Sequence, residues 1–137
     1  MSETAPKQRP QFRNVSVGQI LTYRLPPAAK VSILHRISGA LLFLALPVVL
    51  LPVLSLSLGS PETFESVSQV VSHPIIKIIF LVLIWAYLHH FCAGIRFLLL
   101  DLGKGNDKAT SQKTAVSVFV ISLLLTLVFA LKLFGVW

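Results

Sequence analysis

The stretch VSILHRISGALLFLALPVVLLPVLSL, Val31–Leu56, decides the fold class of this chain. From Ile37 onward it contains no charged residue, and about 20 apolar residues are enough to span the hydrocarbon core of a bilayer. Its first turns nevertheless contain Ser32, His35 and Arg36. Polar side chains at such a position are either headgroup anchors or part of a binding site.

Two further stretches, 78–95 and 114–131, are also long and uncharged. Over all 137 residues the mean hydropathy is +0.81, with 55% apolar and 12% charged residues, which is too apolar for a water-soluble globule. The sequence therefore predicts an all-α membrane protein with three transmembrane helices. We expect a segment 1–30 outside the membrane and an anchor domain 31–137, with spans at about 31–58, 74–102 and 113–136.

Lys and Arg are distributed unevenly around these spans. Residues 1–36 contain six of them, the 59–73 segment contains none, and the 102–113 segment contains Lys104, Lys108 and Lys113. Basic loops stay in the cytoplasm, so we predict that the N-terminus and the 102–113 loop are cytoplasmic. The net charge of +7 follows from this topology, and no nucleic-acid partner is predicted from it.

The first 30 residues lack the apolar core of a cleaved signal peptide, and a bacterial inner membrane is the expected location. The RLPP sequence predicts irregular structure until about Ala28. Pro47 and Pro52 are expected to kink the first span.

Capping residues predict a short helix between the first two spans. Ser60 is a good N-cap, and Pro61 suits the first helical position. Its apolar residues share one face, which predicts that this helix lies along the outer membrane surface: Phe64, Val67 and Val71.

The polar residues of the first span share one helix face. Ionisable groups at membrane depth are costly and usually mark a site. Arg36 alone is explained equally well as an interfacial anchor. Together, Ser32, His35 and Arg36 above Gly39 favour an anionic or carbonyl-bearing ligand.

His90 is the candidate metal ligand of the second span. In helical projection Ala86, Ala93 and Gly94 lie within about 60° of it, whereas His89 points away. Small residues beside an imidazole leave room for a planar macrocycle, whose iron the imidazole can bind. A histidine hydrogen-bonded across a helix interface explains the same pattern. If His90 binds haem, the second axial ligand is expected from another subunit.

Two motifs built on these residues resemble those of the cytochrome b556 membrane-anchor subunits of bacterial succinate dehydrogenase. The first motif comprises Arg9-Pro10 and then Ser32, His35, Arg36 and Ser38. The second comprises His90, Gly94, Ile95, Arg96, Phe97, Asp101 and Gly103. The resemblance covers nearly the whole chain.

The resemblance implies a subunit of succinate:quinone oxidoreductase (complex II) that is not catalytic by itself. The implied partners are a second small membrane anchor, an iron–sulfur subunit and a flavoprotein, which pass electrons from succinate to ubiquinone in the tricarboxylic acid cycle and respiratory chain. His90 would be one axial ligand of haem b, and the second anchor would supply the other. Ser32 and Arg36 would bind ubiquinone, and His35 and Arg36 would lie near the haem propionates, supported by Gly94, Arg96 and Asp101.

Other functions remain open from the sequence. The nearest is a fumarate reductase-type cytochrome b anchor. A small transport subunit or a haem-free scaffold is a more distant alternative. A transporter predicts polar residues along a continuous path, but the outer halves of the spans contain no ionisable residue apart from the terminal Lys77 and Lys132.

Overall fold

The computed structural model describes residues 16–136. These residues form helices and no strands, which confirms the predicted all-α fold. The elements are α1 (Val17–Thr22), α2 (Pro27–Ala45), η1 (Leu46–Leu50), α3 (Leu51–Gly59), α4 (Pro61–Ser72), α5 (Pro74–Asp101) and α6 (Lys108–Leu133).

Three helical stretches are long and apolar enough to cross a membrane. The first runs continuously through α2, η1 and α3 for 33 residues, and α5 and α6 have 28 and 26 residues. At about 1.5 Å per residue each exceeds the ~30 Å hydrocarbon core. The prediction of a multi-pass membrane protein with three spans is confirmed.

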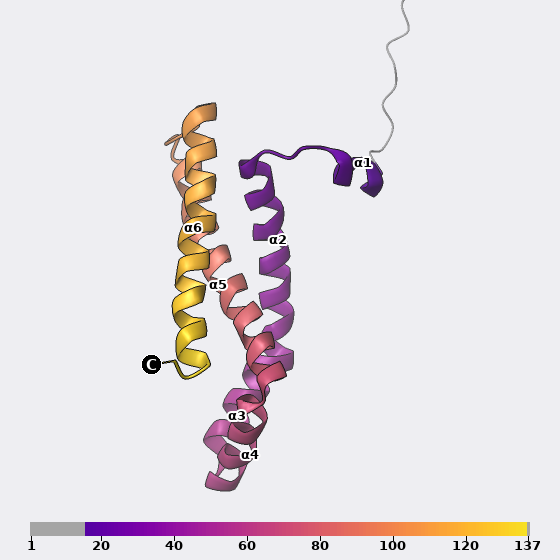
Figure 1. Ribbon diagram of the computed structural model, residues 1–137, viewed down its shortest axis with the longest axis vertical. Helices are drawn as coiled ribbons and strands as arrows, with labels where there is room; N and C mark the ends of the chain where they lie inside the picture. Colours follow the sequence, from indigo (N-terminus) through magenta and orange to yellow (C-terminus); the bar gives the residue numbers. More distant parts are fainter. Residues whose placement is uncertain (1–15, 137) are drawn as a thin grey trace, which may run out of the picture.

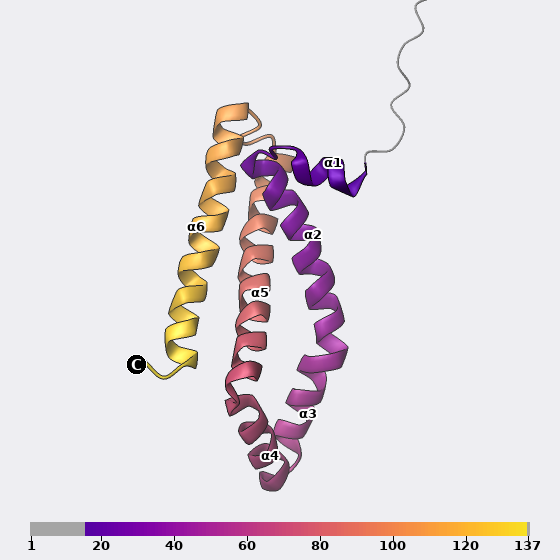
Figure 2. The same ribbon diagram turned by 45° about the vertical axis from the view of Figure 1, so that its right-hand side comes forward.

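The three spans pack side by side, with α5 between α2 and α6 (Figures 1 and 2). Small residues at the centre allow this close approach. The buried core is formed by Val31, Ala93, Ala115 and Val118, and Cys92 packs against it. At one end of the bundle, the N–H of Ala28 donates to Oε1 of Gln112 at 3.4 Å, which joins the start of α2 to α6.

The first span is interrupted by the π-helical segment η1, which contains Pro47. Pro47 and Pro52 have no N–H to continue the α-helical hydrogen bonds, so the backbone widens locally, and the N–H of Leu51 donates to the carbonyl of Leu46. The chain changes direction between α2 and α3 (Figure 2). The predicted kink is therefore present as a π-segment.

The N-terminal segment differs from the irregular chain expected before Ala28. Residues 17–22 form α1, which projects away from the bundle (Figure 1). A capping box begins it: the N–H of Gln19 donates to Oγ of Ser16 at 3.3 Å, and the N–H of Ser16 donates to Oε1 of Gln19 at 2.9 Å. Arg9-Pro10 lies outside the described residues.

The helix predicted between the first two spans is present as α4. The N–H of Thr63 donates to Oγ of the N-cap Ser60 at 3.3 Å, and Pro61 occupies the first helical position. Val67 and Val71 face an apolar groove bounded by α3, α4 and the start of α5, rather than lying on an open face. An orientation along the outer membrane surface stays a prediction.

The α5–α6 connection ends one span and begins the next within six residues. Gly103 and Gly105 have φ of 73° and 77°, a backbone region that favours glycine. The N–H of Thr110 donates to Oδ1 of Asp107 at 2.9 Å, which caps α6. This hydrogen-bonded exposed cap holds the pKa of Asp107 below its usual value.

Candidate functional site

The two histidines predicted to serve the site lie face to face. The rings of His35 on α2 and His90 on α5 are parallel within 6°, with centroids 4.1 Å apart. The ring of Phe97 is tilted against His35 at 5.1 Å. The structure thus brings His35 of the first span into contact with the candidate ligand of the second.

Both hydrogen bonds of the His90 ring in the described structure use Nδ1. This atom lies 3.0 Å from the backbone oxygen of His35 and 3.4 Å from Oγ of Ser38. A carbonyl oxygen can only accept, so we assign the proton of a neutral His90 to Nδ1. The lone pair then resides on Nε2, which is the arrangement required of an imidazole that binds a metal through that atom.

Two glycines let these rings lie against the opposite helix. A Cβ added to Gly39 would be 2.8 Å from Cε1 of His90, so the ring lies directly on the α2 backbone. A Cβ added to Gly94 would be 3.8 Å from Nε2 of His35, which is ordinary contact. The contact at Gly39 is therefore much the tighter of the two.

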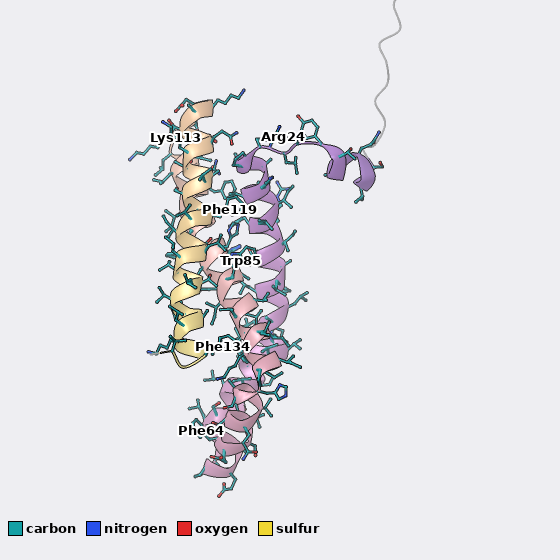
Figure 3. All side chains as sticks on the ribbon, in the orientation of Figure 1. Arg24, Phe64, Trp85, Lys113, Phe119 and Phe134 are labelled. Atoms are coloured by element: carbon teal, nitrogen blue, oxygen red, sulfur yellow. The ribbon has the colours of Figure 1, made fainter. Side chains whose placement is uncertain are left out.

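His89 occupies a different environment from His90. Its side chain is 0% exposed, and its ring centroid lies 5.3 Å from that of Trp85 and 5.5 Å from that of Phe119. Figure 3 labels these two aromatic side chains. Among residues 16–136, neither ring nitrogen of His89 has a hydrogen-bond partner, and Nε1 of Trp85 also lacks one. His89 is a core residue of the three-helix bundle.

One expectation about this helix was wrong. Ala86 and Ala93 were expected to border an open groove beside His90, but both are 0% exposed and share the buried stripe of α5 with His89 and Arg96. In helical projection Ala86 and Ala93 lie between His89 and His90. In the structure this face of α5 packs against the neighbouring helices and is buried. Of the three small residues, Gly94 alone lies at the histidine stack.

Ser32 and Arg36 lie one turn apart on α2, and His35 precedes Arg36 in the same turn. Ser32 is half-buried and Arg36 is exposed. A guanidinium at the surface of the bundle is available to a ligand or to a neighbouring subunit. The two predicted quinone-binding residues are thus close to the histidine stack on the same helix.

Arg96 joins α5 to α6 and is only 6% exposed. Its Nε donates to Oγ1 of Thr114 at 3.2 Å, and one terminal nitrogen donates to the backbone oxygen and Oγ of Ser111 at 3.2 and 3.0 Å. Asp101 is exposed at the end of α5. In the described structure Arg96 therefore joins two helices, and its guanidinium also lies 5.4 Å from the ring of Phe97, which packs against His35.

Comparison with known families is decisive for the class of this protein. Residues 6–129 match the family described as succinate dehydrogenase/fumarate reductase transmembrane subunit. The chain belongs to this family. The match includes all three spans except the last residues of α6.

Relatives of this succinate dehydrogenase family member come from several bacteria. The succinate dehydrogenase cytochrome b556 subunit of Coxiella burnetii is 37% identical over 116 residues, covering 84% of this chain and 88% of the relative. The subunit of the same name from Rickettsia felis is 31% identical over 124 residues, covering 90% and 96%. That of Paracoccus denitrificans is 33% identical over 103 residues, covering 75% and 78%.

Sequence reasoning about this family member missed the contacts that hold the His90 ring. Ser38 was noted as a motif residue and Gly39 as a residue that leaves space, but neither was connected with His90. Their spacing of three and four residues from His35 is a visible signal of a shared helix face. Which residue of α5 meets that face depends on how the two helices cross, and no local pattern contains that information.

Proposed function

We propose that this chain is a membrane anchor of a succinate dehydrogenase complex, that His90 ligates haem b, and that Ser32 and Arg36 form part of the ubiquinone site. The observation that carries the proposal is the hydrogen bond between Nδ1 of His90 and the backbone oxygen of His35 at 3.0 Å. It leaves Nε2 for iron, in the way that backbone carbonyls hydrogen-bonded to the other ring nitrogen orient metal-binding histidines.

The surroundings of His90 fit a haem better than a metal ion held by side chains alone. Within residues 16–136 no three His, Cys, Asp or Glu residues are grouped to bind a metal. Iron at His90 would therefore arrive in a cofactor that supplies most of its own ligands. His90 is only half-buried, whereas His89 is enclosed by its own chain and could be reached only by separating the helices.

The parallel stack argues that the second axial ligand belongs to another subunit. To hold one haem together, His35 and His90 would each have to direct a ring nitrogen at the same iron, but their rings lie face to face at 4.1 Å. We therefore propose that a second small membrane anchor supplies the other histidine. His35 and Arg36 would then lie near the haem propionates, where a guanidinium stabilises negative charge.

The proposed quinone site uses the exposed end of α2. The hydroxyl of Ser32 would hydrogen-bond a quinone carbonyl, and Arg36 would stabilise negative charge that develops on the same headgroup. Flavin and iron–sulfur chemistry require other chains, since the single cysteine of this one cannot hold a cluster. Haem b supplies a one-electron redox group beside the quinone site when it is bound.

Substitution of the two neighbouring histidines tests the haem assignment. His90→Leu and His89→Leu each remove one imidazole and keep a similar side-chain volume. In the purified complex, the reduced-minus-oxidised spectrum of His90→Leu should lose or alter the b-type bands, and His89→Leu should retain them. Equal loss in both variants, or loss in His89→Leu alone, would contradict the assignment.

A further inference from the structure

The turn of α2 from His35 to Gly39, named here the His90-binding turn, contacts the imidazole of His90 in three ways besides the stacked ring of His35. The backbone oxygen of His35 and Oγ of Ser38 lie 3.0 and 3.4 Å from Nδ1. Ser38 is itself buried, and its hydroxyl donates to the His35 oxygen at 3.0 Å. Beyond them, the ring lies on the bare backbone of Gly39.

The contact at Gly39 is a steric reason for glycine at this position. A Cβ there would be 2.8 Å from Cε1 and 3.2 Å from Nδ1 of His90, well inside the ~3.5–4.0 Å of a favourable carbon contact. An added methyl group would push the imidazole away from α2. That displacement would lengthen or break the hydrogen bond from Nδ1 to His35.

The backbone does not require glycine at Gly39. It lies in the interior of α2, and the glycines with positive φ in the described structure are at other positions. In a helix interior, glycine is less favourable than alanine by roughly 0.5–1 kcal/mol. The glycine is therefore explained by the approach of the His90 ring rather than by helix geometry.

We propose that the His90-binding turn positions the axial imidazole, with Gly39 setting how closely the ring approaches α2. The His35 carbonyl and the Ser38 hydroxyl set the rotation of the same ring. The proposal rests on the proposed function, because it takes His90 as the haem ligand. Gly39 and Ser38 are positioning residues that act through His90.

A matched pair of glycine variants separates this role from the general effect of a methyl group added to a helix. Gly39→Ala and Gly18→Ala add the same methyl group to helical glycines, one in α2 and one in α1. At Gly18 the added Cβ would be 3.9 Å from Oγ of Ser16, which requires no movement. Because the atom displaced in Gly39→Ala is the end of a side chain, that variant is expected to assemble.

The experiment uses the whole complex purified from membranes with its partner subunits. The haem-to-flavin ratio and the low-field electron paramagnetic resonance feature of the oxidised haem are measured for each variant. That feature depends on the orientation of the axial imidazoles. Gly39→Ala should shift it, or lower the haem-to-flavin ratio at least two-fold, with unchanged subunit stoichiometry. Gly18→Ala should match the wild type in both measurements.

A wild-type resonance and haem content in Gly39→Ala would overturn the proposal, and so would equal changes in both glycine variants. If Gly39→Ala does not assemble, Ser38→Ala decides, because it removes the hydroxyl without adding volume. A shifted resonance in Ser38→Ala supports the proposal, and an unchanged one overturns it. A wild-type complex without b-type haem, or a His90→Leu complex that keeps its spectrum, instead contradicts the proposed function itself.

Discussion

His89 and His90 are separated by about 100° around α5 and have different chemical possibilities. His89 is enclosed by Trp85 and Phe119, and within the described residues neither of its nitrogens has a hydrogen-bond partner, so it contributes volume to the core at the cost of two unmade hydrogen bonds. His90 has a bonded Nδ1 and a half-buried position beside α2. Only the second arrangement presents an oriented imidazole to a group outside the bundle.

Ser32→Ala tests the quinone site at a single hydroxyl. Loss of a hydrogen bond to a charged or charge-developing oxygen costs roughly 1.5–3 kcal/mol, which corresponds to about 10- to 150-fold. Succinate-driven quinone reduction by the intact complex should fall by about this factor. Succinate oxidation with an artificial acceptor that takes electrons upstream should be unchanged, because flavin and clusters lie in other chains.

Ser117→Ala is the matched control for Ser32→Ala. Ser117 is an exposed serine of α6, and its hydroxyl donates to the backbone oxygen of Thr114 within the same helix. The complex that contains Ser117→Ala should reduce quinone at the wild-type rate. If Ser32→Ala keeps the wild-type rate and KM of quinone reduction, the Ser32 hydroxyl does not bind quinone and the quinone-site assignment is wrong.

At the scale of helices, α5 and α6 are joined by more than apolar packing. The guanidinium of Arg96 bonds Thr114 and Ser111 across the interface, close to the connection that Gly103 and Gly105 allow to turn. In lipid there is little hydrophobic driving force between helices, so buried polar contacts of this kind matter for their association. The motif residue Arg96 thus has a structural explanation independent of any cofactor.

Arg96→Leu should lower the thermal stability of the complex. A hydrogen bond to a charged group contributes about 1.5–3 kcal/mol, and this substitution removes several of them while leaving Ser111 and Thr114 without their donor. Arg96→Lys should recover only part of the loss, because an ammonium cannot reproduce the guanidinium fork. An unchanged melting temperature in Arg96→Leu would contradict this role.

Local signals in the sequence predicted most of the elements. Ser60 and Pro61 were predicted to begin α4 and do so, because caps act within one turn. Pro74 at the start of α5 and the glycines after Asp101 are local signals of the same kind. The short helix α1 was missed, since the Ser16–Gln19 capping box precedes only six helical residues. The contact of Gly39 with His90 could not be predicted, because it depends on the crossing of α2 and α5.

The whole molecule leaves much of its apolar surface uncovered by its own chain. Beyond η1 the first span diverges from α6, and α3 packs on α4 instead (Figure 2). Large apolar residues of α3, such as Leu51, Leu54 and Leu58, are exposed there. In a membrane this surface faces lipid or another subunit, which agrees with a chain that serves as one part of a larger complex.

The direction of the chain across the membrane is the largest-scale prediction. Helix α1 and the α5–α6 connection lie at one end of the bundle, and α4 lies at the other (Figure 1). Of the described residues, Arg24, Lys30, Lys104 and Lys108 lie at the first end, so the positive-inside rule predicts that this end is in the cytoplasm. Ser68 in α4 and Asn106 in the α5–α6 connection are both exposed, and this topology places them on opposite sides of the membrane.

Labelling of single added cysteines by a membrane-impermeant thiol reagent on spheroplasts tests this orientation. Ser68→Cys should react at once, and Asn106→Cys should react only after the membrane is permeabilised. The parent chain is the control, because its single cysteine, Cys92, lies within α5. Labelling of Asn106→Cys but not Ser68→Cys in intact spheroplasts would reverse the topology. It would also move Ser32, Arg36 and the proposed quinone site to the outer face, away from a cytoplasmic iron–sulfur partner.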